Sequence, residues 1–241
     1  MGVKNILLDI ATTIIPKSIQ RRIINRSEQS GIQIYSQAGE DKLLERLLGV
    51  KSYGIYVDVG AHHPTLLSNT YYFYKKGWRG INVDAMPDSM KLFNKLRPYD
   101  INIEKPVSDD NSIGTFYTFS ASELNTFDET KVDVFLNFPN VALLNKMPLQ
   151  TTSLESILDN YLPQLGVDIQ IDFLTVDVEG LDLKVLKSNN WDKYRPTIVL
   201  AEDLFSDVTQ SCNGELNQFM KSVGYQMIAK TFNTVFFKNN V

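Results

Sequence analysis

Acidic side chains follow three apolar segments that have the composition of buried strands. Asp84, Asp177 and Glu202 each stand at the end of such a segment, with Glu179 and Asp203 close behind. Ligands of an open parallel α/β sheet bind at the carboxyl ends of its strands, so we expect these acids to gather at one site. Carboxylates that cluster repel one another and are stabilised by a cation. We expect that cation to be either the charge of a bound ligand or a divalent metal.

The metal alternative has a defined set of ligands. Asp177, Glu202 and Asp203 would offer carboxylate oxygens of the kind that Mg²⁺ accepts. Such an ion would lower the pKa of a substrate hydroxyl and orient it. The competing interpretation is that Glu202 and Asp203 cap a helix or pair with lysine or arginine.

The turn after residues 55–59 narrows the choice of ligand. It holds a single glycine, Gly60, whereas a dinucleotide pyrophosphate requires several glycines to approach the backbone. Asp58 would also repel a phosphate. An acid about 20 residues after such a turn, here Asp84, hydrogen-bonds ribose hydroxyls. The pattern favours a nucleoside with a positive charge and no phosphate, and S-adenosylmethionine meets both conditions. The alternative is a structural βαβ unit with a buried, capped Asp58.

The two histidines of the chain are adjacent. His62 and His63 follow Gly60 and Ala61 directly. Histidine is the side chain best suited to take a proton near neutral pH, so either is a candidate base beside the nucleoside. The alternative is that one of them packs or caps a turn while the other is solvated.

The periodicity predicts an α/β protein of the Rossmann-like type. Apolar strand patterns alternate with helical patterns, and the final pair, 225–229 and 234–237, is too close for a crossover helix. We expect a mostly parallel seven-stranded sheet that ends in an antiparallel hairpin, within one domain over residues 35–241. Residues 120–150 read as a long, irregular loop, which we interpret as a substrate lid.

Composition limits the other possibilities. The chain has 241 residues and a net charge of −4. This charge lacks the excess of basic residues that is typical of proteins that bind nucleic acid. A single cysteine excludes an intrachain disulfide, and the lack of a membrane span or signal-peptide pattern predicts a cytoplasmic protein. Residues 1–34 read as a basic amphipathic helical arm. We expect it to pack on the domain or on a second copy in a homodimer, and peripheral contact with an anionic membrane is the alternative.

A series of short motifs resembles the FkbM family of S-adenosylmethionine-dependent methyltransferases. Together they extend over about residues 33–205, and their order and spacing are more specific than any one of them. The motifs are residues 36–41, 56–64, 68–70, 77–80, 84–87, 124–127 and 175–180. The family's Gly-Ala-Asn sequence is replaced here by Gly60-Ala61-His62, as in a His-His-Pro subgroup. The role usually given to that asparagine is therefore open.

The resemblance implies a class I methyltransferase fold and methyl transfer to a hydroxyl oxygen. We expect an O-methyltransferase that acts on a sugar, a glycan or another polyhydroxylated acceptor. The expected catalytic residues are His62, His63, Asp177 and Glu179. The expected cosubstrate residues are Gln37, Glu40, Asp58, Gly60, Ala61, Ser68, Asn69, Asp84, Ala85, Ser108, Asp109 and Asp177. The competing hypothesis is a non-catalytic module that binds a partner or a membrane through the basic arm.

Overall fold

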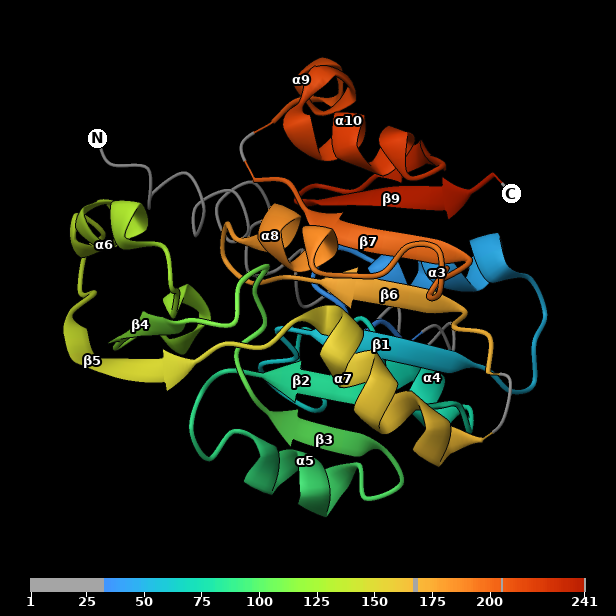
Figure 1. The fold of residues 1–241 in the computed structure, drawn as a ribbon, viewed down its shortest axis with the longest axis horizontal. Coiled ribbons are helices and arrows are strands. Elements are labelled where there is room, and N and C mark those ends of the chain that lie inside the picture. The colour runs from blue at the N-terminus through green and yellow to red at the C-terminus, as the bar shows by residue number, and fades with distance from the viewer. Residues whose placement is uncertain (1–32, 167–168, 205, 241) are drawn as a thin grey trace, which may run out of the picture. The chain divides into compact units, whose positions relative to one another are not determined.

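The computed structural model describes residues 33–166, 169–204 and 206–240. Its main feature is a seven-stranded sheet in the order β3-β2-β1-β6-β7-β9-β8 (Figure 1). The strands are β1 (Ile55–Val59), β2 (Arg79–Asp84), β3 (Ile101–Glu104), β6 (Phe173–Val176), β7 (Ile198–Glu202), β8 (Tyr225–Lys230) and β9 (Thr234–Asn239). From β3 to β7 the neighbouring strands pair in parallel, whereas β9 is antiparallel to both β7 and β8. The predicted fold class and terminal hairpin are confirmed.

Helices cover both faces of this sheet (Figure 1). They are α3 (Glu40–Leu48), α4 (Tyr71–Lys75), α5 (Met90–Leu96), α7 (Leu154–Tyr161), α8 (Asp182–Lys187), α9 (Val208–Asn213) and α10 (Glu215–Ser222), and a 3₁₀ turn spans Leu162–Leu165. Strand β1 is buried along its whole length, because alternate side chains enter two apolar clusters. Val57 packs in the cluster that includes α7, α8 and α10, and Tyr56 packs in the cluster with α3 and α4.

Residues Phe116–Met147 belong to a second compact unit, separate from Tyr35–Thr115 and Pro148–Val241. The segment contains regular elements: β4 (Ile113–Phe119), a 3₁₀ turn (Ser122–Leu124), α6 (Glu129–Leu136) and β5 (Leu143–Gln150), with β4 paired to β5. It has an aromatic core of its own, formed by Tyr117, Phe119, Phe135 and Phe138 with Val132. The expected irregular loop over residues 120–150 was therefore wrong, since its spaced aromatic residues form that core. Its role as a lid stays a prediction.

Side-chain oxygens accept backbone N–H groups at the start of several helices. Helix α4 begins at Tyr71, and the Ser68 hydroxyl accepts the backbone N–H groups of Thr70 and Tyr71. Helix α7 begins after Ser153, whose hydroxyl accepts from Ser156 N. Helix α9 begins with a capping box, formed by Asp207 and Gln210.

The predicted arm at residues 1–34 lies almost entirely outside the described residues. In the described ranges, no helix has both the length and the apolar character needed to cross a membrane.

Candidate functional site

The turn after β1 lies at the point where the strand order reverses. The chain runs from β1 outward through β2 and β3, and later returns to place β6 on the other side of β1. Gly60 N and Ala61 N both donate to Val83 O, at 2.9 and 3.0 Å, so the turn is held against the end of β2. Such a reversal is where ligands bind in α/β sheets.

Gly60 is required at this turn by packing. Its φ angle is +84°, and a Cβ built there would lie 1.7 Å from the carbonyl oxygen of Asp177. A side chain would force the ends of β1 and β6 apart. The glycine therefore brings the ends of three strands together, and this requirement is independent of any ligand.

Asp84 links the end of β2 to the turn after β1. Its Oδ2 accepts from His62 N at 2.9 Å and its Oδ1 accepts from Met86 N at 2.8 Å. Burial raises the pKa of Asp84, while the hydrogen bonds from Met86 and His62 act in the opposite direction. Each carboxylate oxygen has a second lone pair. The half-buried carboxylate is thus fixed in place and can still accept further hydrogen bonds.

Asp58 is buried within β1 and is held by a hydroxyl. Its Oδ2 accepts from Thr70 Oγ1 at 2.7 Å. Burial raises the pKa of Asp58 to about 6, although Thr70 and the positive charge of Arg97 oppose this shift. The charges of Asp84 and Asp100 act with burial. A carboxyl group with a pKa of about 6 therefore lies two residues before Gly60.

The two histidines have different environments. Nδ1 of His63 accepts from Thr65 N at 3.2 Å and from Leu66 N at 3.1 Å, which places the proton of the neutral ring on Nε2. Burial, and then the charge of His62, lowers the pKa of His63. His63 thus stabilises its own loop, and its other nitrogen is a donor. The side chain of His62 is exposed, and its backbone has a positive φ of 49°.

The acids after β6 and β7 gather as expected, but with one different member. Asp177, Glu179 and Glu202 each place a carboxylate oxygen within 4.8 Å of the others, and they form the candidate metal-binding group found among the described residues. Asp203 instead forms an ion pair with Lys230 at 3.6 Å. Glu179 therefore takes the place that we expected Asp203 to occupy.

Asp182 holds together the two chain segments that carry this group of acids. Reasoning from the sequence did not identify its role. Its buried carboxyl accepts from Gly180 N at 3.3 Å through Oδ2 and from Glu202 N at 3.2 Å through Oδ1. It thereby joins the turn after β6 to the end of β7. Burial, and then the charge of Asp177, raises the pKa of Asp182 to about 7. In the sequence, an acid in the first turn of a helix is explained by the helix dipole, which conceals this role.

The methyltransferase FkbM domain matches residues 58–227, which is more than half of the chain. The chain belongs to this FkbM family of methyltransferases. Among solved structures, a TehB-like SAM-dependent methyltransferase from Corynebacterium glutamicum ATCC 13032 Kitasato is similar, with 9% sequence identity and a TM-score of 0.41. The alignment covers 92% of this chain and 96% of that chain. No curated protein gave a significant match.

Two of the expected cosubstrate residues precede the matched range of this FkbM methyltransferase. Glu40 is buried, and its carboxylate accepts from Ala38 N at 2.8 Å and from the Thr231 hydroxyl at 2.6 Å. These bonds tie the segment before α3 to the turn between β8 and β9. Gln37 is exposed on the same segment. A role for Glu40 at the cosubstrate stays a prediction, and its contacts already explain its burial.

The remaining expected residues lie within the matched range of the FkbM domain. Asn69 donates to Thr175 Oγ1 at 3.0 Å, and the Ser68 hydroxyl, on the same loop, accepts from Tyr71 N at 3.1 Å. Ser108 N donates to Thr152 O at 2.9 Å, and the Ser108 hydroxyl donates to Asp109 at 3.3 Å. Ala85 follows Asp84 and is half-buried.

Proposed function

We propose that this protein is an S-adenosylmethionine-dependent O-methyltransferase of the cytoplasm, with a sugar or glycan hydroxyl as acceptor. The observation that carries this proposal is the pair of carboxylates, Asp58 and Asp84, on either side of a single-glycine turn at the reversal of the strand order. The pair fits a cationic nucleoside and disfavours a pyrophosphate. Membership of the FkbM family supports methyl transfer in general.

The roles of the residues follow from their places in the fold. Asp84 would accept the ribose hydroxyls, and Asp58 with Gly60 and Ala61 would hold the methionine part. Ser108 and Asp109, after β3, would contact the adenine side. The cosubstrate supplies an electrophilic methyl group on a sulfonium. The protein's main contribution would be to hold the acceptor oxygen in line with that methyl group, and positioning of this kind accounts for much of a displacement reaction's acceleration.

The group of Asp177, Glu179 and Glu202 supports a polyhydroxylated acceptor. Ionised carboxylates are hydrogen-bond acceptors only, and each can accept from more than one hydroxyl. Three of them within 4.8 Å form a surface that sugar hydroxyls can donate to. The same group supports a second candidate role, because three carboxylates can also hold Mg²⁺.

The proposed cosubstrate site is tested by Asp84→Ala. This change removes a charged acceptor for the ribose, and such hydrogen bonds contribute about 1.5–3 kcal/mol. We expect the dissociation constant for S-adenosylmethionine to rise about tenfold or more, measured by calorimetry. Glu104→Ala is the matched control. Glu104 pairs in register with Asp84 at the end of β3, but we propose no contact between Glu104 and the cosubstrate. Equal affinities for the two variants would remove Asp84 from the ribose site.

For the base, we propose His62 in preference to a metal-activated hydroxyl. His63 uses Nδ1 within its own loop, whereas His62 is exposed beside Asp84. With an accepted sugar, His62→Ala should reduce turnover by roughly 10²–10⁴-fold, and wild-type turnover should survive a chelator. Complete loss on chelation, restored by Mg²⁺, would assign the activation to the acid group instead.

The acceptor class is tested by incubation of the protein with a methyl-labelled donor and glycan extracts. We expect label in a glycan fraction, stable to base as an ether is. The alternative, a binding module that acts through its basic N-terminal arm, predicts cosubstrate binding without transfer. Removal of residues 1–30 then separates the two functions. We expect the truncated protein to keep cosubstrate binding, and any loss of a dimer or of membrane association would identify the role of the arm.

A further inference from the structure

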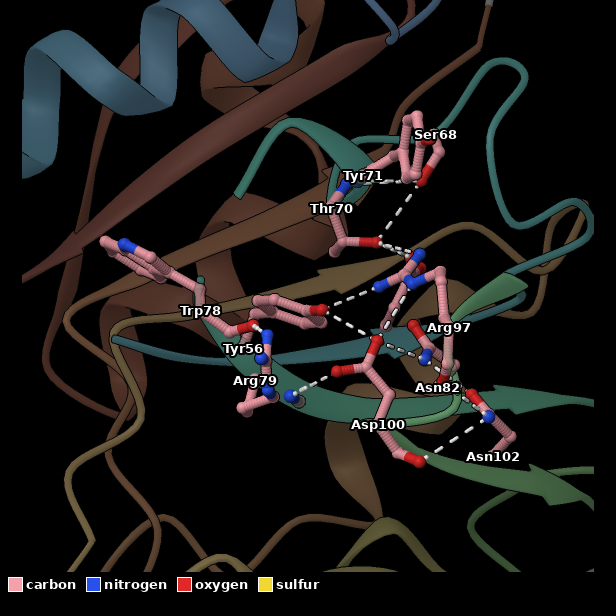
Figure 2. A network of polar contacts seen from close by, with 12 residues as sticks. Tyr56, Ser68, Thr70, Tyr71, Trp78, Arg79, Asn82, Arg97, Asp100 and Asn102 are labelled. Atoms are coloured by element: carbon pink, nitrogen blue, oxygen red, sulfur yellow. Dashed lines mark hydrogen bonds and ion pairs between the residues drawn. The ribbon is translucent and has the colours of Figure 1, made fainter. Parts of the chain in front are cut away.

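A fully buried ion pair, Arg97 with Asp100, belongs to a network of polar contacts (Figure 2). Arg97, at the end of α5, and Asp100, just before β3, have no exposed side-chain surface and join through Nε and Oδ2 at 2.8 Å. Asp100 also accepts from Gly80 N and from the Asn82 amide, both at 3.0 Å. The pair therefore sits against the middle of β2.

The guanidinium of Arg97 extends this network toward β1. Its Nη2 donates to the Tyr56 hydroxyl at 2.8 Å, and that hydroxyl donates to Asp100 at 2.8 Å. Its Nη1 donates to Thr70 Oγ1 at 3.0 Å, and Thr70 in turn donates to Asp58 at 2.7 Å. Figure 2 shows Thr70 between its neighbour Ser68 and the guanidinium of Arg97.

The direction of these bonds is determined by chemistry. A guanidinium is a donor only, so Thr70 Oγ1 accepts from Arg97, and its single hydrogen is left for Asp58. One oxygen of Asp58 is thereby fixed. The charged groups that act on Asp58 are the cation of Arg97 and the carboxylates of Asp84 and Asp100. Arg97 is thus the favourable charge among them.

A buried ion pair of this kind gives little net stability compared with apolar residues of the same volume. The position of the Arg97–Asp100 pair gives it a role other than stabilising the fold. The network ends on the carboxylate that we have assigned to the methionine part of the cosubstrate, and it is connected to that carboxylate through one hydroxyl. The ammonium group of that methionine part needs an ionised acceptor whose orientation is already set.

We propose that Arg97 and Thr70 are positioning residues for the cosubstrate, which hold the Asp58 carboxylate toward the ammonium group of the methionine part. This inference rests on the proposed function, because Asp58 matters in this way only if an adenosylated amino acid binds.

The test compares two nucleosides that differ only in the amino-acid part. S-adenosylhomocysteine has the ammonium and carboxylate groups, and 5′-methylthioadenosine lacks them. We expect Thr70→Val to weaken S-adenosylhomocysteine binding about tenfold or more, since it removes a hydrogen bond to a charged group. Binding of 5′-methylthioadenosine should not change. Thr70→Ser, which keeps the hydroxyl, is the matched control and should bind both ligands as the wild type does.

The pH dependence provides a second readout. The Thr70 hydroxyl stabilises the ionised form of Asp58, so its removal raises the pKa of that carboxyl further. The loss of S-adenosylhomocysteine affinity in Thr70→Val should therefore be larger at pH 6.5 than at pH 8.5. Arg97→Met should show the same selective loss. Because it leaves Asp100 without its partner, that variant can fail to fold, and the Thr70 variants then decide the question.

The possible results separate the two proposals. If the wild type binds neither nucleoside, the proposed function fails and this inference fails with it. If the wild type binds both, and Thr70→Val weakens both equally or neither, then only the inference is overturned. The network would in that case support the fold alone.

Discussion

Gly60→Ala is expected to lower the free energy of unfolding by more than about 4 kcal/mol, a loss found only where a substitution meets a severe local conflict. The added Cβ would lie 1.7 Å from the Asp177 carbonyl oxygen, which belongs to backbone that cannot move without disturbing β6. The positive φ of +84° adds strain for any residue with a side chain. Urea denaturation followed by circular dichroism measures the change.

Gly77→Ala is the matched control for this prediction. Gly77 also has a positive φ, of +94°, but a Cβ there meets no atom within 4 Å. It should therefore show the strain of the backbone alone, about 1–2 kcal/mol. If the two alanine variants were equally stable, the close approach of the β1 turn to the end of β6 would be wrong.

Asp100→Ala should destabilise the protein by about 3–5 kcal/mol, because it leaves the buried guanidinium of Arg97 without its partner. The same change removes the acceptor for Gly80 N and for the Asn82 amide. A buried donor that loses its acceptor keeps the full cost of its desolvation. Thermal and urea unfolding should both show the loss.

An exposed ion pair of the main unit provides the comparison. Asp159 pairs with Lys193 at 2.7 Å, and both side chains are about half exposed. Asp159→Ala should change the stability little, since solvent and salt screen such pairs. A similar loss in the two variants would mean that the Arg97–Asp100 pair is more accessible to water than the structure shows.

The sheet and its ligand edge could be predicted because their signals are local. Apolar runs of four to six residues identify buried strands, and the short connection between β8 and β9 identifies a hairpin. The acids Asp84, Asp177 and Glu202 stand at strand ends in the sequence itself. The parallel arrangement then brings them to one edge, as topology requires.

Other parts of the site depend on contacts between distant residues. Asp203 forms an ion pair with Lys230, whereas Glu179 lies close to Asp177. The sequence does not distinguish these two acids, because each follows a strand in the same way. The network of Arg97 is similar. An arginine at the end of a short helix reads as a surface residue, and only the packing of α5 against the sheet reveals its burial.

The segment 120–150 was misread as an irregular loop for a third reason. Its aromatic residues are separated by polar ones, and this spacing fits an irregular loop as well as a small paired unit. A small paired unit forms only if residues such as Tyr117 and Phe135 pack in the same cluster. In this structure they do so, in a core of their own. Local propensity carries no information on such a contact.

The two hydrogen bonds that Asp84 accepts from His62 N and Met86 N have a consequence for the thermodynamics of binding. An acid on an unconstrained side chain loses conformational entropy when a ligand orders it, about 0.5–1.5 kcal/mol per side chain. Here that entropy is already lost when the protein folds. A ribose that binds Asp84 would therefore gain more affinity from each hydrogen bond, and selection for tight cosubstrate binding would act on the same residue that stabilises the turn.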